Sequence, residues 1–188
     1  MKKKFNREKI MKRFTRRHTA EYGVVQNGAV IQFVREYSFL SNFYPVSVVV
    51  NNVVFPSVEN AYQAMKFRKY MWYEFVDIMP GEAKRLAIYM AKLLDDSGSY
   101  EDNEHYYDFV ITKKKIMVMK ELLLKKFNND EMRDKLLKTN GLKLVEGNVW
   151  NDIFWGVDLR SPDNSKLGFV GKNYLGKLLM EVRNELIN

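Results

Sequence analysis

Residues 46–66 read VSVVVNNVVFPSVENAYQAMK, and this stretch contains the clearest structural signals of the chain. Two runs of β-branched residues flank Asn51-Asn52, a pair whose side chains tolerate the left-handed backbone of a tight hairpin turn. Pro56-Ser57 then breaks the second strand and supplies a helix N-cap. Apolar residues recur at helical spacing after it, which predicts a helix over residues 58–70. The stretch therefore predicts a β-hairpin followed directly by a helix.

Outside this stretch the hydrophobic pattern predicts mostly helices. Strands are expected over residues 30–37 and 142–146. An aromatic loop over 39–45 ends the first of them. Helical spacing predicts further helices over residues 71–79, 82–94, 106–127, 130–138 and 174–187. The polar stretch 95–103 and the tryptophan-bearing stretch 147–156 are expected to be loops. We therefore predict an α+β fold, mainly helical with a small antiparallel sheet.

The composition of the chain predicts one compact domain and excludes several kinds of active site. Its 188 residues are 46% hydrophobic, and it contains no cysteine and only two histidines, His18 and His105. A disulfide framework, a thiolate zinc site and a cysteine nucleophile are excluded, and a Ser-His-Asp triad or a histidine-rich metal site is poorly supported. Carboxylates remain for acid–base chemistry, with no metal and no cofactor expected. Without a long apolar run or a leader-like h-region, a cytoplasmic location is expected.

The positive charge of the chain is concentrated at its N-terminus. The formal net charge is +8, and residues 1–17 contain nine Lys and Arg against Glu8 alone, so the remainder is neutral. We therefore divide the chain into a basic arm, residues 1–29, and a catalytic domain, residues 30–188. Residues 2–17 of the arm could contact nucleic acid phosphates, or the arm could be an ordinary solvated segment. The sequence leaves both alternatives open, and it leaves the oligomeric state open too.

Three groups of residues could carry chemistry. Glu59, Gln63 and Lys66 are spaced to project from one face of the helix predicted over 58–70, although a solvated face is the simpler explanation. A second group combines carboxylates with aromatic rings that could stack on a base, unless the rings only anchor the loop; it comprises Glu146, Trp150, Asp152, Phe154 and Trp155-Gly156. A third group, Gly171-Lys172-Asn173 with Gly176, begins the last helix, where backbone amides could hold a phosphate.

Four motifs that follow one another along the chain carry a resemblance to a known family. They are FLSNF at 39–43, PSVENAYQAMK at 56–66, VE at 145–146 with Asp152 and WG at 155–156, and GKNYLGKLLMEVR at 171–183. In this order the chain resembles the NADAR family, also called YbiA-like, over about residues 30–186. The resemblance implies an α+β domain that recognises ADP-ribose-like or ribose-phosphate ligands and hydrolyses an N-glycosidic bond without a metal.

The resemblance also implies which residues act. Glu59 and Asp152 are expected to be the catalytic carboxylates, with interchangeable roles, and we expect the two stretches that carry them to meet across one cavity. Substrate-binding residues carried over from the family are Asn42, Phe43, Lys66, Lys84, Trp155, Asn173 and Arg183. Lys66 and Lys84 would bind phosphate, and Trp155 and Phe43 would enclose the base. The chain departs from the family where it has Tyr106, Tyr107 and Phe109 in place of a tryptophan followed by a basic residue.

The resemblance leaves more than one function open. Characterised relatives act on phosphorylated riboflavin-pathway intermediates, which makes 5-amino-6-ribosylaminouracil phosphate a substrate to expect. Other relatives remove ADP-ribose from modified guanine in nucleic acid, and here the basic arm could dock the polynucleotide. A non-catalytic binder of ADP-ribose or NAD is the third alternative, although a pure binder of an anion gains little from retained carboxylates.

Overall fold

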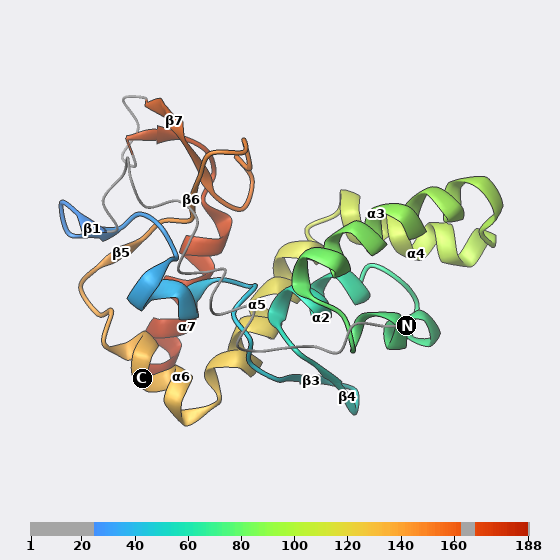
Figure 1. The fold of residues 1–188 in the computed structure, drawn as a ribbon, viewed down its shortest axis with the longest axis horizontal. Coiled ribbons are helices and arrows are strands. Elements are labelled where there is room, and N and C mark those ends of the chain that lie inside the picture. Colours follow the sequence, from blue (N-terminus) through green and yellow to red (C-terminus); the bar gives the residue numbers. More distant parts are fainter. Residues whose placement is uncertain (1–24, 163–167, 188) are drawn as a thin grey trace. The chain divides into compact units, whose positions relative to one another are not determined.

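The computed structural model describes residues 25–162 and 168–187, so most of the predicted basic arm lies outside the described residues. The described chain falls into two compact units (Figure 1). The first unit contains residues 42–126, and the second contains residues 25–41 together with the described part of 127–187. Helices predominate and the strands are short, which confirms the expected α+β class. None of the described helices combines the length and apolar character that crossing a membrane requires.

The predicted hairpin is present in the first unit. Strand β3 (Val48–Val50) pairs antiparallel with β4 (Val53–Phe55). Asn51 and Asn52 connect them with φ values of 46° and 66°, as a tight hairpin turn requires. Side chains alternate between buried and exposed along both strands, so one face of the hairpin belongs to the core.

Helix α2 (Val58–Ala64) follows the hairpin and is buried at every position. The Ser57 side chain accepts a hydrogen bond from Asn60 N at 3.1 Å, which confirms the predicted N-cap. The helix ends at Ala64, earlier than the predicted residue 70. The predicted helix over 71–79 is instead the 3₁₀ helix η2 (Lys69–Phe75), and the amide of Asn60 ties its end to α2 by donating to the Phe75 and Ile78 carbonyls.

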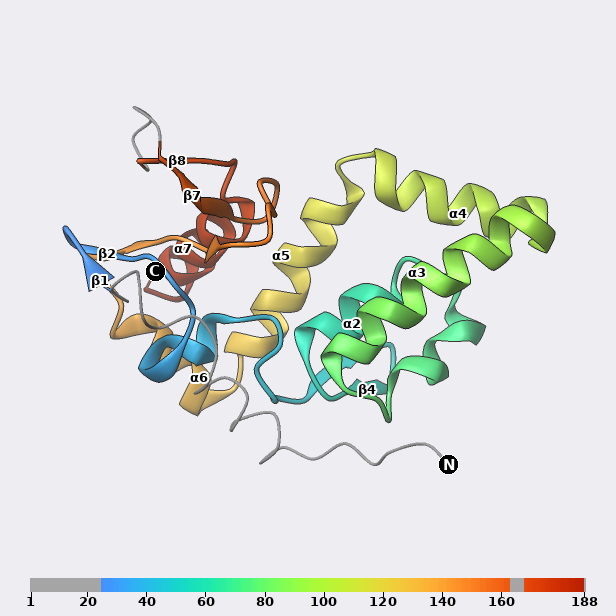
Figure 2. The ribbon, with the colours of Figure 1, turned by 45° about the horizontal axis from the view of Figure 1, so that its top comes forward.

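Three longer helices complete the first unit. They are α3 (Pro80–Ser97), α4 (Tyr100–Ile111) and α5 (Lys114–Phe127), and Figures 1 and 2 show α3 and α4 side by side. The predicted loop over 95–103 shrinks to two residues, because Ser99 caps α4. The prediction of one helix over 106–127 is wrong. Thr112 ends α4, and its hydroxyl accepts from Lys114 N at 3.1 Å to begin α5.

The second unit contains two small sheets and two helices. Strands β1 (Val25–Gln26), β2 (Ala29–Val30) and β5 (Lys143–Leu144) form one sheet, in which β2 and β5 are parallel. The predicted strand over 30–37 is wrong beyond Val30, because Arg35 has φ 52° and begins the 3₁₀ helix η1 (Arg35–Leu40). The strand predicted over 142–146 is shorter than expected. Helix α6 (Asp130–Leu137) and helix α7 (Tyr174–Ile187) lie where helices were predicted.

The other sheet of the second unit was not foreseen in the sequence. Strands β6 (Gly147–Asn148) and β7 (Val157–Pro162) are parallel, and β8 (Phe169–Val170) pairs antiparallel with β7. Both sheets of this unit are therefore mixed, so the expectation of an antiparallel sheet holds only for the hairpin β3–β4. The apolar cluster of this unit consists of Ile31, Val145, Val157 and Leu159.

Glycines in the second unit allow backbone segments to approach closely. A Cβ atom on Gly176 would lie 2.1 Å from the Leu144 carbonyl oxygen, and one on Gly156 would lie 2.0 Å from the Glu146 carbonyl oxygen. Neither contact leaves space for a methyl group. The start of α7 is thus packed directly against the end of β5, and the end of the tryptophan-bearing loop against the segment that follows it.

We expect Gly176→Ala to lower the free energy of unfolding by about 3 kcal/mol, because the new methyl group overlaps fixed backbone. Chemical denaturation measures this loss. Gly81→Ala is the matched control, since its Cβ would meet only Arg85 Nη1 at 3.8 Å in the first turn of α3. That variant should be as stable as the wild type or gain up to about 1 kcal/mol. Equal stability of both variants would contradict the close approach.

Candidate functional site

Helix α2 buries an acid and an amide beside each other in the first unit. Glu59 and Gln63 are one helical turn apart, and Gln63 Nε2 donates to Glu59 Oε1 at 2.8 Å. Their exposed fractions are 7% and 4%, so the alternative that this face is simply solvated is wrong. A buried carboxylate has to be stabilised by hydrogen bonds or charges, and the amide supplies one such bond.

Asn42 is held beside this pair. Its carbonyl oxygen accepts from Glu59 N at 2.9 Å, and its side-chain Nδ2 lies 3.4 Å from Met119 Sδ on α5. The side chain of Asn42 is 7% exposed. Among the residues that the structure describes, neither Asn42 Oδ1 nor Gln63 Oε1 has a hydrogen-bond partner. The structure thus brings predicted residues Asn42 and Glu59 together, whereas Phe43, which follows Asn42, is half-buried.

Lysines gather near Glu59 in the first unit. Burial lowers the pKa of Lys66, the positive charges of Lys84 and Lys115 lower it further, and the nearby Glu59 opposes the shift. The Lys66 ammonium also lies 5.3 Å from the centre of the Tyr62 ring. Lys84 and Lys115 thus lie within the range at which their charges act on Lys66, and the three are called the lysine cluster below.

Lys115 was not identified from the sequence. It is half-buried, and its Nζ donates to the Val110 carbonyl at 2.9 Å. Its position four residues before Met119, whose side chain is buried, is the signal that could have revealed its inward orientation.

Aromatic rings support this cluster where the chain departs from the family pattern. Phe109 is fully buried and contacts the Tyr62 ring edge-on at 5.5 Å, while Tyr106 stacks on Phe67 at the same centroid distance. These rings therefore pack within the first unit and hold the helix that carries Glu59 and Gln63.

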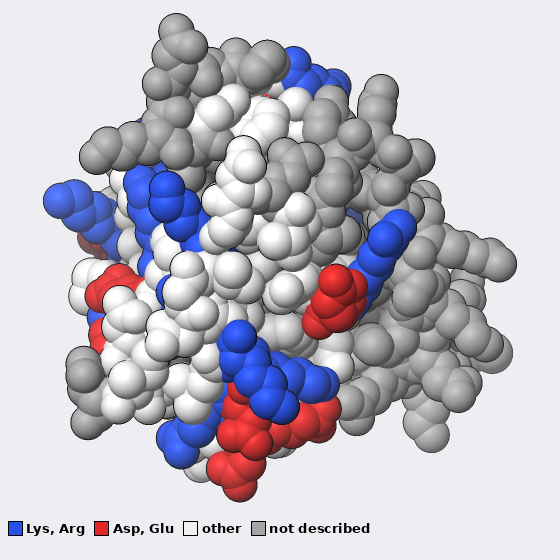
Figure 3. Space-filling view, turned by 90° about the vertical axis from the view of Figure 1, so that its left-hand side faces the viewer, with Lys and Arg blue, Asp and Glu red and all other residues white. Residues whose placement is uncertain are grey.

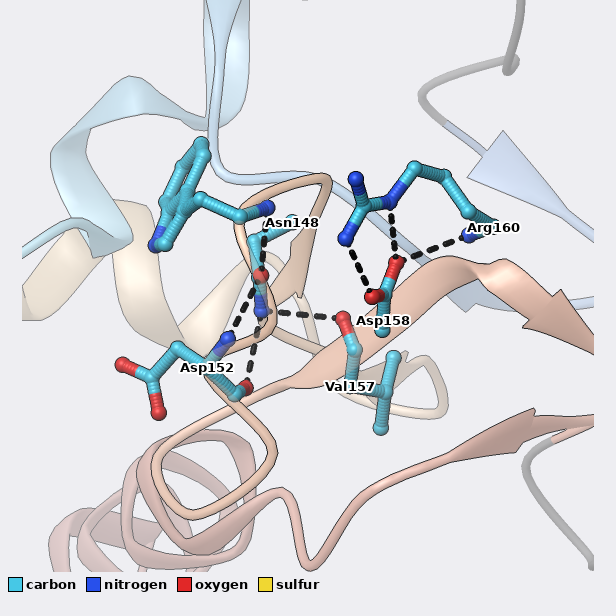
Figure 4. Close-up of polar contacts among 6 residues, drawn as sticks. Asn148, Asp152, Val157, Asp158 and Arg160 are labelled. Carbon is cyan, nitrogen blue, oxygen red and sulfur yellow. Dashed lines mark hydrogen bonds and ion pairs between the residues drawn. The ribbon is translucent and has the colours of Figure 1, made fainter.

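In the second unit, Asn148 organises the tryptophan-bearing loop (Figure 4). Its Nδ2 donates to the carbonyls of Asp152 and Val157, both at 2.9 Å. Its Oδ1 accepts from Asp152 N at 3.0 Å and from Trp150 N at 3.1 Å. The side chain is 1% exposed, so all its hydrogen-bonding capacity is used to shape the backbone. Asn148 was not identified from the sequence.

The same loop brings the predicted residues Asp152 and Trp155 together. Asp152 Oδ1 accepts from Trp155 N at 2.9 Å and from Phe154 N at 3.2 Å. Its carboxylate points away from the Asn148 amide in Figure 4. Trp155 is half-buried and meets the Phe154 ring at a centroid distance of 5.0 Å and an angle of 88°. A carboxylate and an indole are therefore presented next to each other.

The prediction that backbone amides at the start of α7 hold a phosphate is wrong. The amides of residues 172–175 donate to carbonyls of residues 153–156, so the loop already occupies these donors. Asn173 is 1% exposed, with Oδ1 accepting from Glu146 N at 3.0 Å and Nδ2 donating to the Leu144 carbonyl at 2.9 Å. It fixes the main chain that carries Glu146, and its contact with substrate stays a prediction.

Arg183 is similarly engaged with the protein itself. Its Nη1 donates to the Thr139 and Leu142 carbonyls after α6, and burial lowers the pKa of its guanidinium. Arg183 as a substrate contact likewise stays a prediction.

A further pair, Asp158 and Arg160 on β7, was not predicted from the sequence. Arg160 Nη2 lies 2.7 Å from Asp158 Oδ2 (Figure 4). Hydrogen bonds from Arg160 lower the pKa of the Asp158 carboxyl.

Other candidate sites among the described residues have less support. These residues include no group of three or more histidine, aspartate or glutamate side chains placed to hold a metal ion. An open depression of about 650 Å³ lies on the first unit, lined by Arg68, Lys69, Glu101, Glu104, His105 and Asp108. None of the predicted site residues lines it. Glu59 belongs to the first unit and Asp152 to the second, and their meeting in one cavity stays a prediction.

Comparison with known proteins gives a consistent match. The sequence model of the NADAR domain matches residues 28–187. A protein named N-glycosidase from Nostoc punctiforme is 32% identical over 158 residues, covering 81% of this chain and 87% of that protein. N-glycosidase YbiA of Escherichia coli is 33% identical over 152 residues, covering 80% and 82%. The NMR structure of E. coli YbiA matches with a TM-score of 0.61 at 30% identity, covering 87% of this chain and 88% of that one.

One further relative is a much longer protein. A riboflavin biosynthesis protein of Vibrio vulnificus is 32% identical over 153 residues, which is 80% of this chain. The chain spans only 36% of that protein's length. The similarity therefore concerns one part of the Vibrio protein.

We expect Asn148→Ala to lower the free energy of unfolding by about 3 kcal/mol, because it leaves buried backbone groups without partners. The fluorescence of Trp155 should change as the loop loses its fixed form. Asn151→Gly is the matched control, since Asn151 is exposed on the same loop with φ 63° and should tolerate glycine within about 0.5 kcal/mol. An unchanged melt for Asn148→Ala would show that its four hydrogen bonds are dispensable.

The lowered pKa of Lys66 predicts a dependence of stability on pH. Its ordinary pKa is 10.5, so between the lowered value and 10.5 the unfolded chain binds more protons at this residue than the folded one. Lys66 should therefore make stability rise with pH in this window, by up to about 1.4 kcal/mol per pH unit. Lys66→Met should remove that rise, as denaturation of both proteins at pH 7 and above would measure. The same dependence of stability on pH in both proteins would contradict the lowered pKa of Lys66.

Proposed function

Because the chain belongs to the NADAR family, we propose that it is an N-glycosidase, a hydrolase that cleaves the bond between a ribose phosphate and its base or amine. Relatives named N-glycosidase align with four-fifths of the chain, which supports this activity at the level of the family. The name of the Vibrio protein favours an intermediate of riboflavin biosynthesis as substrate, and we propose 5-amino-6-ribosylaminouracil phosphate. The buried Glu59 carboxylate, held by Gln63 near a lysine cluster, is the observation on which this proposal depends most.

N-glycosidic cleavage develops positive charge on the ribose ring as the base departs. A carboxylate fixed close to that charge stabilises the transition state more than the ground state, and its effect is largest where water is excluded. Glu59 is nearly inaccessible and its Oε1 is fixed by an amide, and both features support such a role. We assign to Glu59 stabilisation of the ribosyl cation or activation of the attacking water.

Asp152 and Trp155 would act on the same substrate. The indole presents a flat apolar surface on which a base can stack, and Phe43 is proposed as the second such surface. Asp152 holds the main chain of Trp155, so it can fix the position of the ring as well as orient ribose hydroxyls. We therefore propose Asp152 as the second catalytic carboxylate, with Glu59 as the principal one.

Phosphate would be bound by the lysine cluster of the first unit. The charges of Lys84 and Lys115 act against the charge of Lys66, and a phosphate dianion would relieve that repulsion. Asn42 would bind the ribose. Asn173 and Arg183 would contribute through the backbone segments that they hold, since both are buried and bonded to main-chain carbonyls.

The nucleic-acid alternative depends on the basic arm, most of which lies outside the described residues. On the face drawn in Figure 3, Lys and Arg side chains of the described residues are interspersed with Asp and Glu. Such a mixed surface does not attract a polyanion strongly. We propose the small-molecule substrate, which the name of the Vibrio relative favours.

We expect Glu59→Gln to lower kcat/KM by about a hundredfold to ten-thousandfold, because the amide cannot stabilise the developing charge. Asp152→Asn should lower kcat/KM by about tenfold to a hundredfold. Mass detection of the freed base measures both, with ribosylaminouracil phosphate, NAD, ADP-ribose and ADP-ribosylated guanine as the substrate panel. Asp96→Asn, an exposed acid on α3, is the matched control and should keep wild-type turnover.

Two outcomes would overturn the proposal. Near wild-type turnover by folded Glu59→Gln would remove Glu59 from its assigned role. Tight binding of ADP-ribose by the wild-type chain, with no base freed from any member of the panel, would make the protein a binder instead of a hydrolase.

A further inference from the structure

The chemistry of the Glu59–Gln63 contact fixes the orientation of the Gln63 amide. An ionised carboxylate can only accept hydrogen bonds, so the amide nitrogen has to face Glu59 Oε1, from which it lies 2.8 Å. The amide oxygen consequently points to the other side. That oxygen is buried and has no hydrogen-bond partner among the described residues.

A buried acceptor without a partner is unusual, because it loses its hydration and gains nothing in return. The same helix shows that this cost is avoidable. Asn60 is fully buried as well, yet its Oδ1 accepts from Ser57 Oγ at 2.6 Å, and its Nδ2 donates to two carbonyls. Asn103 Oδ1 also has no partner among the described residues, but Asn103 is only half-buried, whereas Gln63 is 4% exposed. A ligand would explain why so deeply buried an acceptor has no partner.

A second acceptor of this kind is associated with Glu59. Asn42 Oδ1 is buried without a partner among the described residues, and the Asn42 carbonyl accepts from Glu59 N. Both amides are more than nine-tenths buried. Gln63 contacts Glu59 through its side chain and Asn42 through its backbone carbonyl, so a ligand beside Glu59 that offers two donors would suit both amides.

We propose that Gln63 recognises a hydroxyl group of the substrate's pentose, accepting its hydrogen bond at Oε1 while Nε2 holds the Glu59 carboxylate. This inference rests on the proposed function, in which Glu59 lies beside C1′ of the ribose. The 2′-hydroxyl is attached to the adjacent carbon, so it is the nearest donor to a group that neighbours Glu59. Asn42 Oδ1 accepts from the second hydroxyl. The substrate class is then a phosphorylated ribose with an intact diol, and 2′-deoxyribose is rejected.

The reason for rejection is the acceptor that a deoxy ligand would leave buried and unsatisfied. Sites built to hydrogen-bond a hydroxyl discriminate strongly against analogues that lack it. Gln63 is thus a positioning residue for Glu59 and a determinant of sugar specificity. Neither role involves a change of covalent bonds at Gln63.

Binding of ribose 5-phosphate and 2-deoxyribose 5-phosphate to the full chain, measured by titration calorimetry, tests this inference without requiring turnover. We expect the wild-type protein to prefer ribose 5-phosphate by about tenfold or more. Gln63→Met, which keeps the volume but removes the acceptor, should reduce the preference to about twofold, mainly by weakening ribose 5-phosphate binding. A wild-type preference below about threefold, or no ribose 5-phosphate binding, would overturn the inference whether or not the variant folds.

Matched variants separate specificity from stability and from phosphate binding. Lys66→Met should weaken the binding of both sugar phosphates by a similar factor and leave the ratio of their dissociation constants unchanged. Asn60→Ala should lower the melting temperature, yet the folded protein should keep the wild-type preference. If Gln63→Met binds both ligands as tightly as the wild type does, Gln63 does not determine the sugar specificity. Release of base from glycosides without any ribose preference would refute this inference alone, whereas a ribose preference without release of base would refute only the proposed hydrolase.

Discussion

The burial of one carboxylate is the constraint on which the candidate chemistry depends. Glu59 lies in a helix that is buried at every position, and a charge in such a place is costly unless hydrogen bonds and opposite charges stabilise it. Gln63 supplies a hydrogen bond, and Lys66, with its charge-coupled neighbours Lys84 and Lys115, supplies positive charge. The like charges of Lys84 and Lys115 act against the charge of Lys66, so an anion bound there would relieve that repulsion. This balance supports the proposed site for a phosphorylated sugar.

In the second unit, hydrogen bonds hold a loop that carries a tryptophan and an aspartate. Asn148 fixes the loop from inside with four hydrogen bonds, and the amides that precede and begin α7 fix it from outside. Gly156 and Gly176 permit the backbone approach that these bonds require. The loop can therefore present Asp152 and Trp155 in a defined geometry although it contains little regular structure.

Some expectations failed because the hydrophobic pattern does not show where the backbone turns or which hydrogen bonds form. The apolar run after Val30 has the composition of a strand, yet the backbone turns at Arg35 and forms a 3₁₀ helix. The helical pattern across Thr112 is continuous in hydrophobicity, but the threonine hydroxyl accepts from Lys114 N and begins a new helix. The glycine-rich start of α7 resembles a phosphate-binding terminus, and only the structure shows its amides to be occupied by the loop.

The sequence by itself determined the hairpin at Asn51-Asn52, the Ser57 cap, the last helix and the family, because these depend on local backbone preferences and on ordered motifs. It also singled out Glu59, Lys66, Asp152 and Trp155. Only the tertiary structure decided that Lys115 joins the lysine cluster, that Asn148 and Asn173 serve the backbone, and that Gln63 carries an unsatisfied buried acceptor. Such facts depend on which groups meet after folding, and hydrogen bonds and desolvation act between residues that no spacing rule connects.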